Sequence, residues 1–175
     1  LTAGNPLNIL CVKITFMASE PIILASASAR RRELFSWINN NFTVFSADID
    51  ETPRPQEDPV SYCERMAREK AIASVIHLGL KSGILLSADT TVILDQTILG
   101  KPENSVHAAE MLRSLSGRTH TVCTAVTLAI PEPEKITLLS TLSETEVHMN
   151  PLSDSLIEAY AASGDPLGKA GAYAI

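Results

Sequence analysis

Three consecutive arginines follow a pair of serines where the sequence predicts the start of a helix. Arg30, Arg31 and Arg32 come directly after Ser26 and Ser28 in the stretch LASASARRREL. Positive charge in the first turn of a helix opposes the helix dipole and costs roughly 0.3–1 kcal/mol for each exposed residue. A bound anion reverses that cost, because backbone N–H groups, serine hydroxyls and guanidinium groups can all donate to it. The alternative is solvated surface charge beside a capping serine.

Two lysines occupy positions where an amine can be held still. Lys70 lies on the apolar stripe of a predicted helix, whose members follow the spacing i, i+3, i+4, i+8 and i+11: Cys63, Met66, Ala67, Ala71 and Ser74. It either delivers its ammonium group to a bound anion or reaches past the edge of the core to water. Lys101 lies between a glycine and a proline in the turn LGKP, which restricts the backbone and could hold the amine in place. The alternative interpretation is that Lys101 is an ordinary loop lysine.

Carboxylates at two places could serve a metal or a water molecule. Asp89 interrupts an apolar, β-type run, and a buried carboxylate is costly unless it is paired, hydrogen-bonded or bound to a metal. A bulge that lets Asp89 cap its own backbone is the alternative. Asp48, Asp50 and Glu51 follow a predicted strand and offer hard oxygen ligands for a divalent cation. Their alternative is a solvated turn.

Strand and helix patterns alternate along the chain, which is typical of an α/β domain. Ser28 is expected to cap a helix whose core face is Leu34, Phe35 and Ile38, and Asp58-Pro59 to begin another. Strands are expected at 21–28, 41–50, 82–95, 120–130 and 136–149, and helices at 28–38, 59–80, from about 105 to 117, and 153–164.

Composition excludes several classes of protein. The 175 residues carry 20 acidic and 14 basic side chains, a net charge of -6, which disfavours nucleic-acid or anionic-membrane partners. Three cysteines without paired spacing argue against a disulfide framework, so we expect a reducing, cytoplasmic location. Four scattered histidines show no metal-ligand spacing. No apolar run approaches the roughly 18 residues that a membrane-spanning helix needs.

The order of these motifs resembles the Maf family of nucleoside triphosphate pyrophosphatases, the septum formation protein Maf-like group. The motifs that carry the resemblance are LASASARRREL, DIDET, MAREKA, SADTTVIL, LGKPEN, AAEMLRSLSGRTHTVCTAVTL and KAGAYAI. The resemblance implies an α/β fold with a mixed twisted sheet, flanking helices and two lobes around a central cleft, similar to the inosine triphosphate pyrophosphatases. It also implies hydrolysis of a nucleoside triphosphate between the α and β phosphates, with Mg²⁺ or Mn²⁺ as cofactor.

The resemblance also implies catalytic, metal-binding and substrate-binding roles for the residues at the family's motif positions. Asp89 would orient and deprotonate the attacking water and, with Glu51, hold the metal, while Lys101 would neutralise developing charge. Lys70 joins Asp89 and Lys101 in the catalytic set and also contacts the triphosphate. The expected substrate-binding set is Ser26, Ser28, Arg30, Arg31 and Thr90, whereas Arg32 is expected to be solvated.

The pair Asp89-Thr90 resembles the branch of the family that acts on dTTP and UTP, with modified pyrimidine nucleotides as further candidates. The family resemblance also suggests a homodimer. We expect residues 1–16 to be an upstream or vector-derived extension, the alternative being an N-terminal strand extension. Residues 17–175 are expected to be a single Maf-like domain that lacks the family's C-terminal strand and helix. The alternative function is a nucleotide-binding regulatory protein linked to cell division, with little or no turnover.

Overall fold

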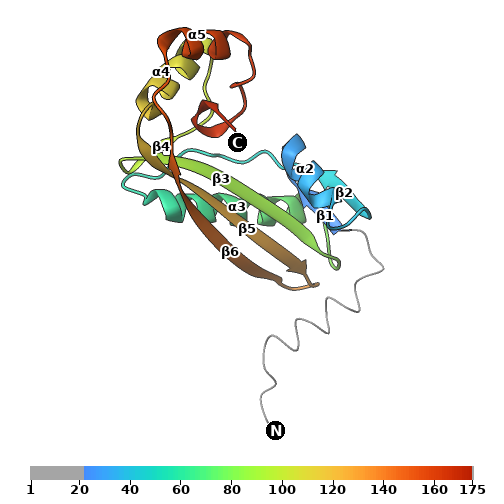
Figure 1. Ribbon diagram of the computed structural model, residues 1–175. Helices are drawn as coiled ribbons and strands as arrows, with labels where there is room; N and C mark the ends of the chain where they lie inside the picture. The colour runs from blue at the N-terminus through green and yellow to red at the C-terminus, as the bar shows by residue number, and fades with distance from the viewer. Residues whose placement is uncertain (1–21, 175) are drawn as a thin grey trace. The chain divides into compact units, whose positions relative to one another are not determined.

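The structure, a computed structural model, describes residues 22–174 of the chain (Figure 1). The expected extension at 1–16 lies outside the described residues, so that assignment and the domain boundary at residue 17 stay predictions. None of the described helices is both long enough and apolar enough to cross a membrane.

The strands form one mixed sheet, as predicted, and the sheet has six strands where the sequence predicted five. The strand order is β2-β1-β3-β5-β6, with β4 paired to β3. β1 is parallel to both β2 and β3, whereas β4 is antiparallel to β3. The strands are β1 (Ile22–Ala25), β2 (Phe42–Phe45), β3 (Leu85–Leu94), β4 (Thr97–Leu99), β5 (Thr119–Pro131) and β6 (Ile136–His148).

Four α-helices and one 3₁₀ turn accompany the sheet in the described part of the chain (Figure 1). They are α2 (Ala29–Ser36), α3 (Pro59–Leu78), α4 (Ser105–Leu115), α5 (Asp154–Ala162) and η1 (Ala170–Ala172). The four α-helices and five of the strands match the predicted order and type, whereas β4 and η1 were not predicted.

The chain divides into two compact units, which we describe separately. Of the described residues, unit 1 comprises those up to Asp50 together with Ala67–Ala88 and Thr127–Ser140, and unit 2 comprises Glu51–Met66, Asp89–Val126 and those from Thr141 onward. Helix α3 and strands β3, β5 and β6 contribute residues to both.

Helix starts follow the predicted local signals. The Ser28 side chain caps α2 by accepting a hydrogen bond from the Arg31 amide. In α3, the Asp58 carboxylate accepts from the Ser61 amide at 2.8 Å, and Pro59 is the first helical residue. Each cap satisfies an N–H group that has no partner within its own helix.

The predicted apolar stripe of α3 is confirmed, because all five of its members are fully buried. In unit 1, Ala71 and Val75 of this helix pack with Ala25, Leu85 and Ala129 from three strands of the sheet. Small side chains on the stripe allow a close approach between helix and sheet.

The predicted core face of α2 is wrong at two of its three positions. Leu34 is 53% exposed and Ile38 is 81% exposed, and the helix has no buried residue. Phe35 is half-buried and packs edge-to-face on Phe42 of β2, with ring centroids 5.1 Å apart. A two-turn helix beside a four-residue strand finds a partner for only one of its apolar side chains.

In unit 2, α4 and α5 pack side by side against η1 (Figure 1). Gly171 of η1 has a φ of +67°, and a β-carbon there would lie 3.0 Å from both γ-carbons of Val92. Its N–H also donates to the Gly100 carbonyl at 3.0 Å. Glycine is therefore required both for the left-handed conformation and for the close approach.

Residues 46–58 connect β2 to α3, and an ion pair holds the end of this loop. Arg65 of α3 donates to both carboxylate oxygens of Glu57, from Nε at 2.5 Å and from Nη2 at 2.7 Å. The hydrogen bond from Arg65 is the main reason that the pKa of Glu57 falls from 4.5 to about 2.

Gly171→Ala should destabilise the protein by more than Gly168→Ala. Both substitutions force alanine into a left-handed conformation, at about 1–2 kcal/mol, but only Gly171→Ala presses a methyl group on Val92, which adds about 1–3 kcal/mol. Urea denaturation of both variants measures the difference. Equal losses of unfolding free energy in the two variants would contradict this, because they would show that the structure accommodates the methyl group beside Val92 at no cost.

Glu57→Gln should remove a stabilisation that depends on pH. Because the folded-state pKa of Glu57 is lowered, its contribution is complete above about pH 4.5 and disappears as the pH falls toward about 2. The gap in unfolding free energy between wild type and variant, measured by urea denaturation, should therefore shrink with acidification. Glu110→Gln, at an exposed position on α4, should show little gap at any pH. A gap for Glu57→Gln that is independent of pH would contradict the ion-pair explanation.

Candidate active site

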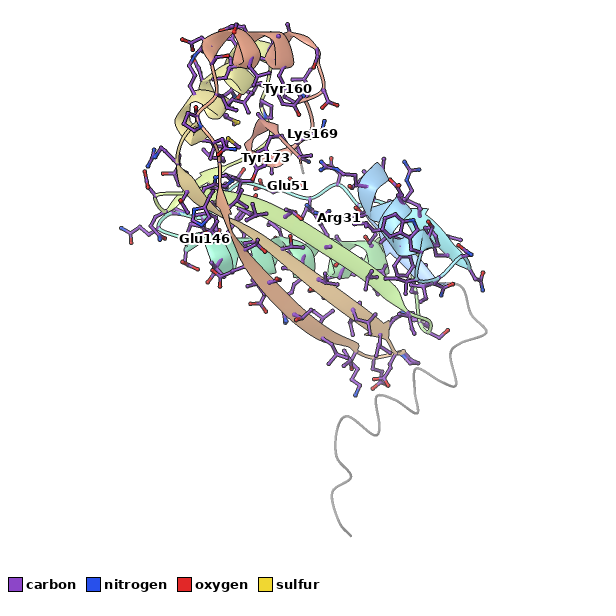
Figure 2. All side chains as sticks on the ribbon, viewed as in Figure 1. Arg31, Glu51, Glu146, Tyr160, Lys169 and Tyr173 are labelled. Atoms are coloured by element: carbon purple, nitrogen blue, oxygen red, sulfur yellow. The ribbon has the colours of Figure 1, made fainter. Side chains whose placement is uncertain are left out.

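In unit 1, three of the predicted phosphate ligands lie together at the start of α2. The Ser26 hydroxyl, 5% exposed, accepts from the Ser28 amide at 3.2 Å and from Nη1 of Arg31 at 3.4 Å. Nη1 of Arg31 also donates to the Ala88 carbonyl at 2.8 Å, so the guanidinium group of this half-buried residue (Figure 2) is held in place. Ser26, Ser28 and Arg31 thus form a fixed group of donors at a helix N-terminus.

The other cations of unit 1 are placed differently. Arg30 and Arg32 are exposed, whereas Lys70 is half-buried on α3. The main-chain carbonyl of Lys70 accepts a hydrogen bond from the Ser74 hydroxyl at 2.7 Å. Exposure of Arg32 agrees with its predicted solvation.

In unit 2, Asp89 lies in the middle of β3 and is 9% exposed. Its Oδ2 accepts a hydrogen bond from the Thr91 hydroxyl at 3.2 Å, and its main-chain carbonyl lies 3.7 Å from Sγ of Cys63. Strand β3 runs through Asp89 from Leu85 to Leu94. The carboxylate is therefore buried and oriented, which suits a group that must position a water molecule.

Glu51 and Lys101, predicted to belong to one site, approach each other in unit 2. Oε2 of Glu51, on the loop before α3 (Figure 2), lies 4.0 Å from Nζ of Lys101, and both side chains are exposed. The turn that carries Lys101 is tied down by the hydrogen bond from the Gly171 amide to the preceding residue, Gly100. A weak, exposed ion pair of this kind contributes little to stability.

Tyr62 is a member of this group that the sequence analysis missed. Its hydroxyl donates to the main-chain carbonyl of Glu51 at 2.8 Å. Burial, and then the negative charges of Asp89 and Glu51, raise the pKa of Tyr62 to about 12. Both carboxylates therefore lie within electrostatic reach of one hydroxyl. The available signal was a tyrosine beside the buried stripe of α3, because a buried tyrosine hydroxyl needs a partner.

Thr90 was predicted to bind substrate. Its hydroxyl shares a hydrogen bond of 3.1 Å with the Thr124 hydroxyl on β5, and its side chain is half-buried. The predicted role stays a prediction.

The acidic residues can be tested for fit to a divalent cation. The described residues contain no group of three or more histidine, cysteine, aspartate or glutamate side chains that could hold a metal by themselves. Mg²⁺ does not require such a group, since it is usually held by one or two carboxylates and the oxygens of a phosphate substrate. The carboxylates of Glu51 and Asp89 have the donor chemistry that such a site uses.

Cysteine and histidine side chains of the described chain show structural roles. Burial raises the pKa of the Cys63 thiol and raises the pKa of the Cys123 thiol to about 12, so both are poor nucleophiles. His120 is buried, its Nε2 lies 2.5 Å from the Tyr173 hydroxyl, and burial lowers its pKa.

Together these groups offer two separate capabilities. Unit 1 presents serine, arginine and backbone donors suited to phosphate oxygens. Unit 2 presents a buried carboxylate, a second carboxylate and a lysine, which suit water activation and neutralisation of charge. Transfer of a phosphoryl group depends mainly on positioning and electrostatic stabilisation, and these are the properties of both groups.

Comparison with known proteins places the chain in a family. A curated dTTP/UTP pyrophosphatase from Chromobacterium violaceum is 49% identical over 157 residues, covering 88% of this chain and 77% of that protein. One from Myxococcus xanthus is 47% identical, covering 88% of this chain and 75% of that protein. Among solved structures, a HAM1 protein from Coxiella burnetii matches with 17% identity and a TM-score of 0.48, covering 74% of this chain and 72% of that one. The family model described as Maf-like protein matches residues 21–175, and the chain therefore belongs to the Maf-like protein family.

Proposed function

We propose that this chain is a nucleoside triphosphate pyrophosphatase that hydrolyses dTTP and UTP to the monophosphate and pyrophosphate. The observation that carries the proposal is the 47–49% identity to relatives named dTTP/UTP pyrophosphatase, across three quarters or more of their length. The alignments cover most of the chain, and the side-chain geometry is compatible with the same chemistry.

In this proposal, unit 1 binds phosphate. Ser26, Ser28 and Arg31 donate to phosphate oxygens, and the bonds that hold Arg31 limit the entropy lost on binding. Arg30 and Lys70 add positive charge, Arg30 from an exposed position and Lys70 from the half-buried face of α3. The unfavourable placement of arginines near the helix N-terminus is then offset by the bound anion.

Unit 2 carries out the hydrolysis. Asp89 orients a water molecule and accepts its proton, the water oxygen bonds to a phosphate group, and the bond between the α and β phosphates breaks. Lys101 neutralises charge that develops on the phosphate oxygens. Glu51 and Asp89 would hold Mg²⁺ or Mn²⁺, and the cation would supply electrostatic stabilisation to the triphosphate.

The same proposal includes the role of Thr90, the range of pyrimidine substrates and the location of the protein. Thr90 contributes to substrate binding, and modified pyrimidine nucleotides join dTTP and UTP as substrates. Buried thiols at Cys63 and Cys123, which are free cysteines, are compatible with a cytoplasmic protein. A homodimer and the absence of a nucleic-acid or membrane partner stay predictions.

A nucleotide panel should distinguish this enzyme from the alternative, a regulatory protein that binds nucleotide with little turnover. With Mn²⁺ or Mg²⁺ present, pyrophosphate release should be fastest with dTTP and UTP, slower with purine triphosphates and 7-methyl-GTP, and absent after addition of excess EDTA. Binding of dTTP by calorimetry without pyrophosphate release from any nucleotide would favour the regulatory protein.

Asp89→Asn should lower turnover of dTTP by at least about 100-fold, because the amide cannot accept the proton from water. The fold should persist, since the asparagine side-chain oxygen can still accept from Thr91, and dTTP should still raise the melting temperature. Asp95→Asn, on the exposed turn after β3, is the matched control and should keep normal turnover. Near-normal turnover of Asp89→Asn would remove Asp89 as the general base.

A further inference from the structure

The loop that carries Glu51 has no regular secondary structure between β2 and α3, and residues 51–56 are exposed. A carboxylate on such a segment would sample many positions if nothing held the backbone. The structure nevertheless records main-chain contacts from this loop to two side chains on the first turns of α3, at Tyr62 and Arg65. These contacts restrict the main chain on both sides of the Glu51–Thr52 peptide bond.

Tyr62 holds the start of the loop. The residue is 8% exposed, and its hydroxyl donates to the Glu51 carbonyl at 2.8 Å. A phenol hydroxyl is protonated at neutral pH and is therefore a hydrogen-bond donor there. The bond uses the main chain of Glu51 and not its carboxylate.

Arg65 holds both the start and the end of the loop. Its Nη2 donates a hydrogen bond to the Thr52 carbonyl at 3.2 Å. Nε and Nη2 also donate to the two carboxylate oxygens of Glu57. A carboxylate oxygen of Glu57 in turn accepts from the Arg54 amide at 2.9 Å. A planar guanidinium group can make these bonds in several directions at once, which an ammonium group cannot reproduce.

Tyr62 and Arg65 also support each other. They are three residues apart on α3 and thus lie on one face of the helix. The Arg65 guanidinium lies 5.4 Å from the centre of the Tyr62 ring, within the range of a cation–π interaction. Both side chains therefore act as one rigid support, anchored by a helix whose next stripe residues, Cys63 and Met66, are fully buried.

We propose that Tyr62 and Arg65 are positioning residues that hold the main chain at Glu51 and Thr52, and thereby aim the Glu51 carboxylate for its work on the nucleotide. This inference rests on the proposed function, because it assigns a purpose to Glu51. Neither residue contacts the reacting atoms. Their effect reaches the chemistry only through Glu51.

Three variants of the full chain test the proposal. Tyr62→Phe removes only the hydroxyl, and Arg65→Lys keeps the charge but loses the forked geometry. Tyr160→Phe is the matched control, because the Tyr160 hydroxyl on α5 donates to the Asp165 carboxylate at 3.0 Å, far along the chain from the loop. All three should remain folded, as judged by circular dichroism.

The first measurement is amide hydrogen exchange of residues 51–57. Loss of one hydrogen bond should speed exchange of this segment by about threefold to tenfold in Tyr62→Phe and at least as much in Arg65→Lys. Tyr160→Phe should leave the segment unchanged. Unchanged exchange in Tyr62→Phe and Arg65→Lys would overturn the proposal whatever the enzyme does.

The second measurement is the dependence of dTTP turnover on Mn²⁺ concentration. If the Glu51 carboxylate is no longer held in position, the Mn²⁺ concentration for half-maximal rate should rise at least about threefold in Tyr62→Phe and Arg65→Lys. Excess Mn²⁺ should restore much of kcat. A purely structural role for Tyr62 and Arg65 predicts faster exchange with no change in Mn²⁺ dependence at any concentration, and this result would overturn the proposal.

The design separates failure of this inference from failure of the proposed function. If the wild-type chain turns over none of the nucleotides, the proposed function fails. Binding of Mn²⁺ in the presence of a dTTP analogue with nitrogen between the α and β phosphates, followed by electron paramagnetic resonance, then replaces turnover as the readout. Weaker Mn²⁺ binding in Tyr62→Phe than in Tyr160→Phe supports the positioning role, and equal binding overturns it.

Discussion

Close packing of α3 against the sheet is the constraint on which the candidate site depends. Every residue of the helix's stripe is fully buried, and the stripe consists mainly of small side chains. In unit 1, the Ala67 carbonyl accepts from the Ser87 hydroxyl at 2.6 Å, and in unit 2, Sγ of Cys63 lies 3.4 Å from the Cys123 carbonyl. A larger side chain on this stripe would push the helix away from the sheet and disturb these short contacts.

This packing also determines which residues of α3 can serve the site. The positions beside the stripe are partly buried, so Tyr62 can place a hydroxyl on the Glu51 carbonyl and Arg65 can reach Thr52 and Glu57. Lys70 lies in line with the stripe and remains half-buried. The first two turns of α3 thereby support the exposed loop that carries Glu51, and the same helix carries Lys70 further along.

Polar side chains in the middle of β3 are tolerated because each has a partner. Asp89 lies in a buried strand, and its carboxylate accepts from Thr91 while its neighbour Thr90 pairs with Thr124. Ser87, fully buried two residues earlier, donates to Ala67. A strand in which such groups are hydrogen-bonded can hold a carboxylate in a low-dielectric setting without the full cost of an unpaired buried charge.

Features that depend on neighbouring residues were accessible from the sequence, and features that depend on distant ones were not. The caps at Ser28 and Asp58 and the stripe of α3 follow from spacing, since helix geometry alone brings their partners together. The expected burial of Leu34 and Ile38 was wrong because burial requires a partner surface, which α2 lacks at those positions. The bonds from Tyr62 to Glu51 and from Gly171 to Gly100 join residues 11 and 71 positions apart. Only the packing of helices and strands brings such pairs within bonding distance, so tertiary structure alone decided how Glu51 and Lys101 are held.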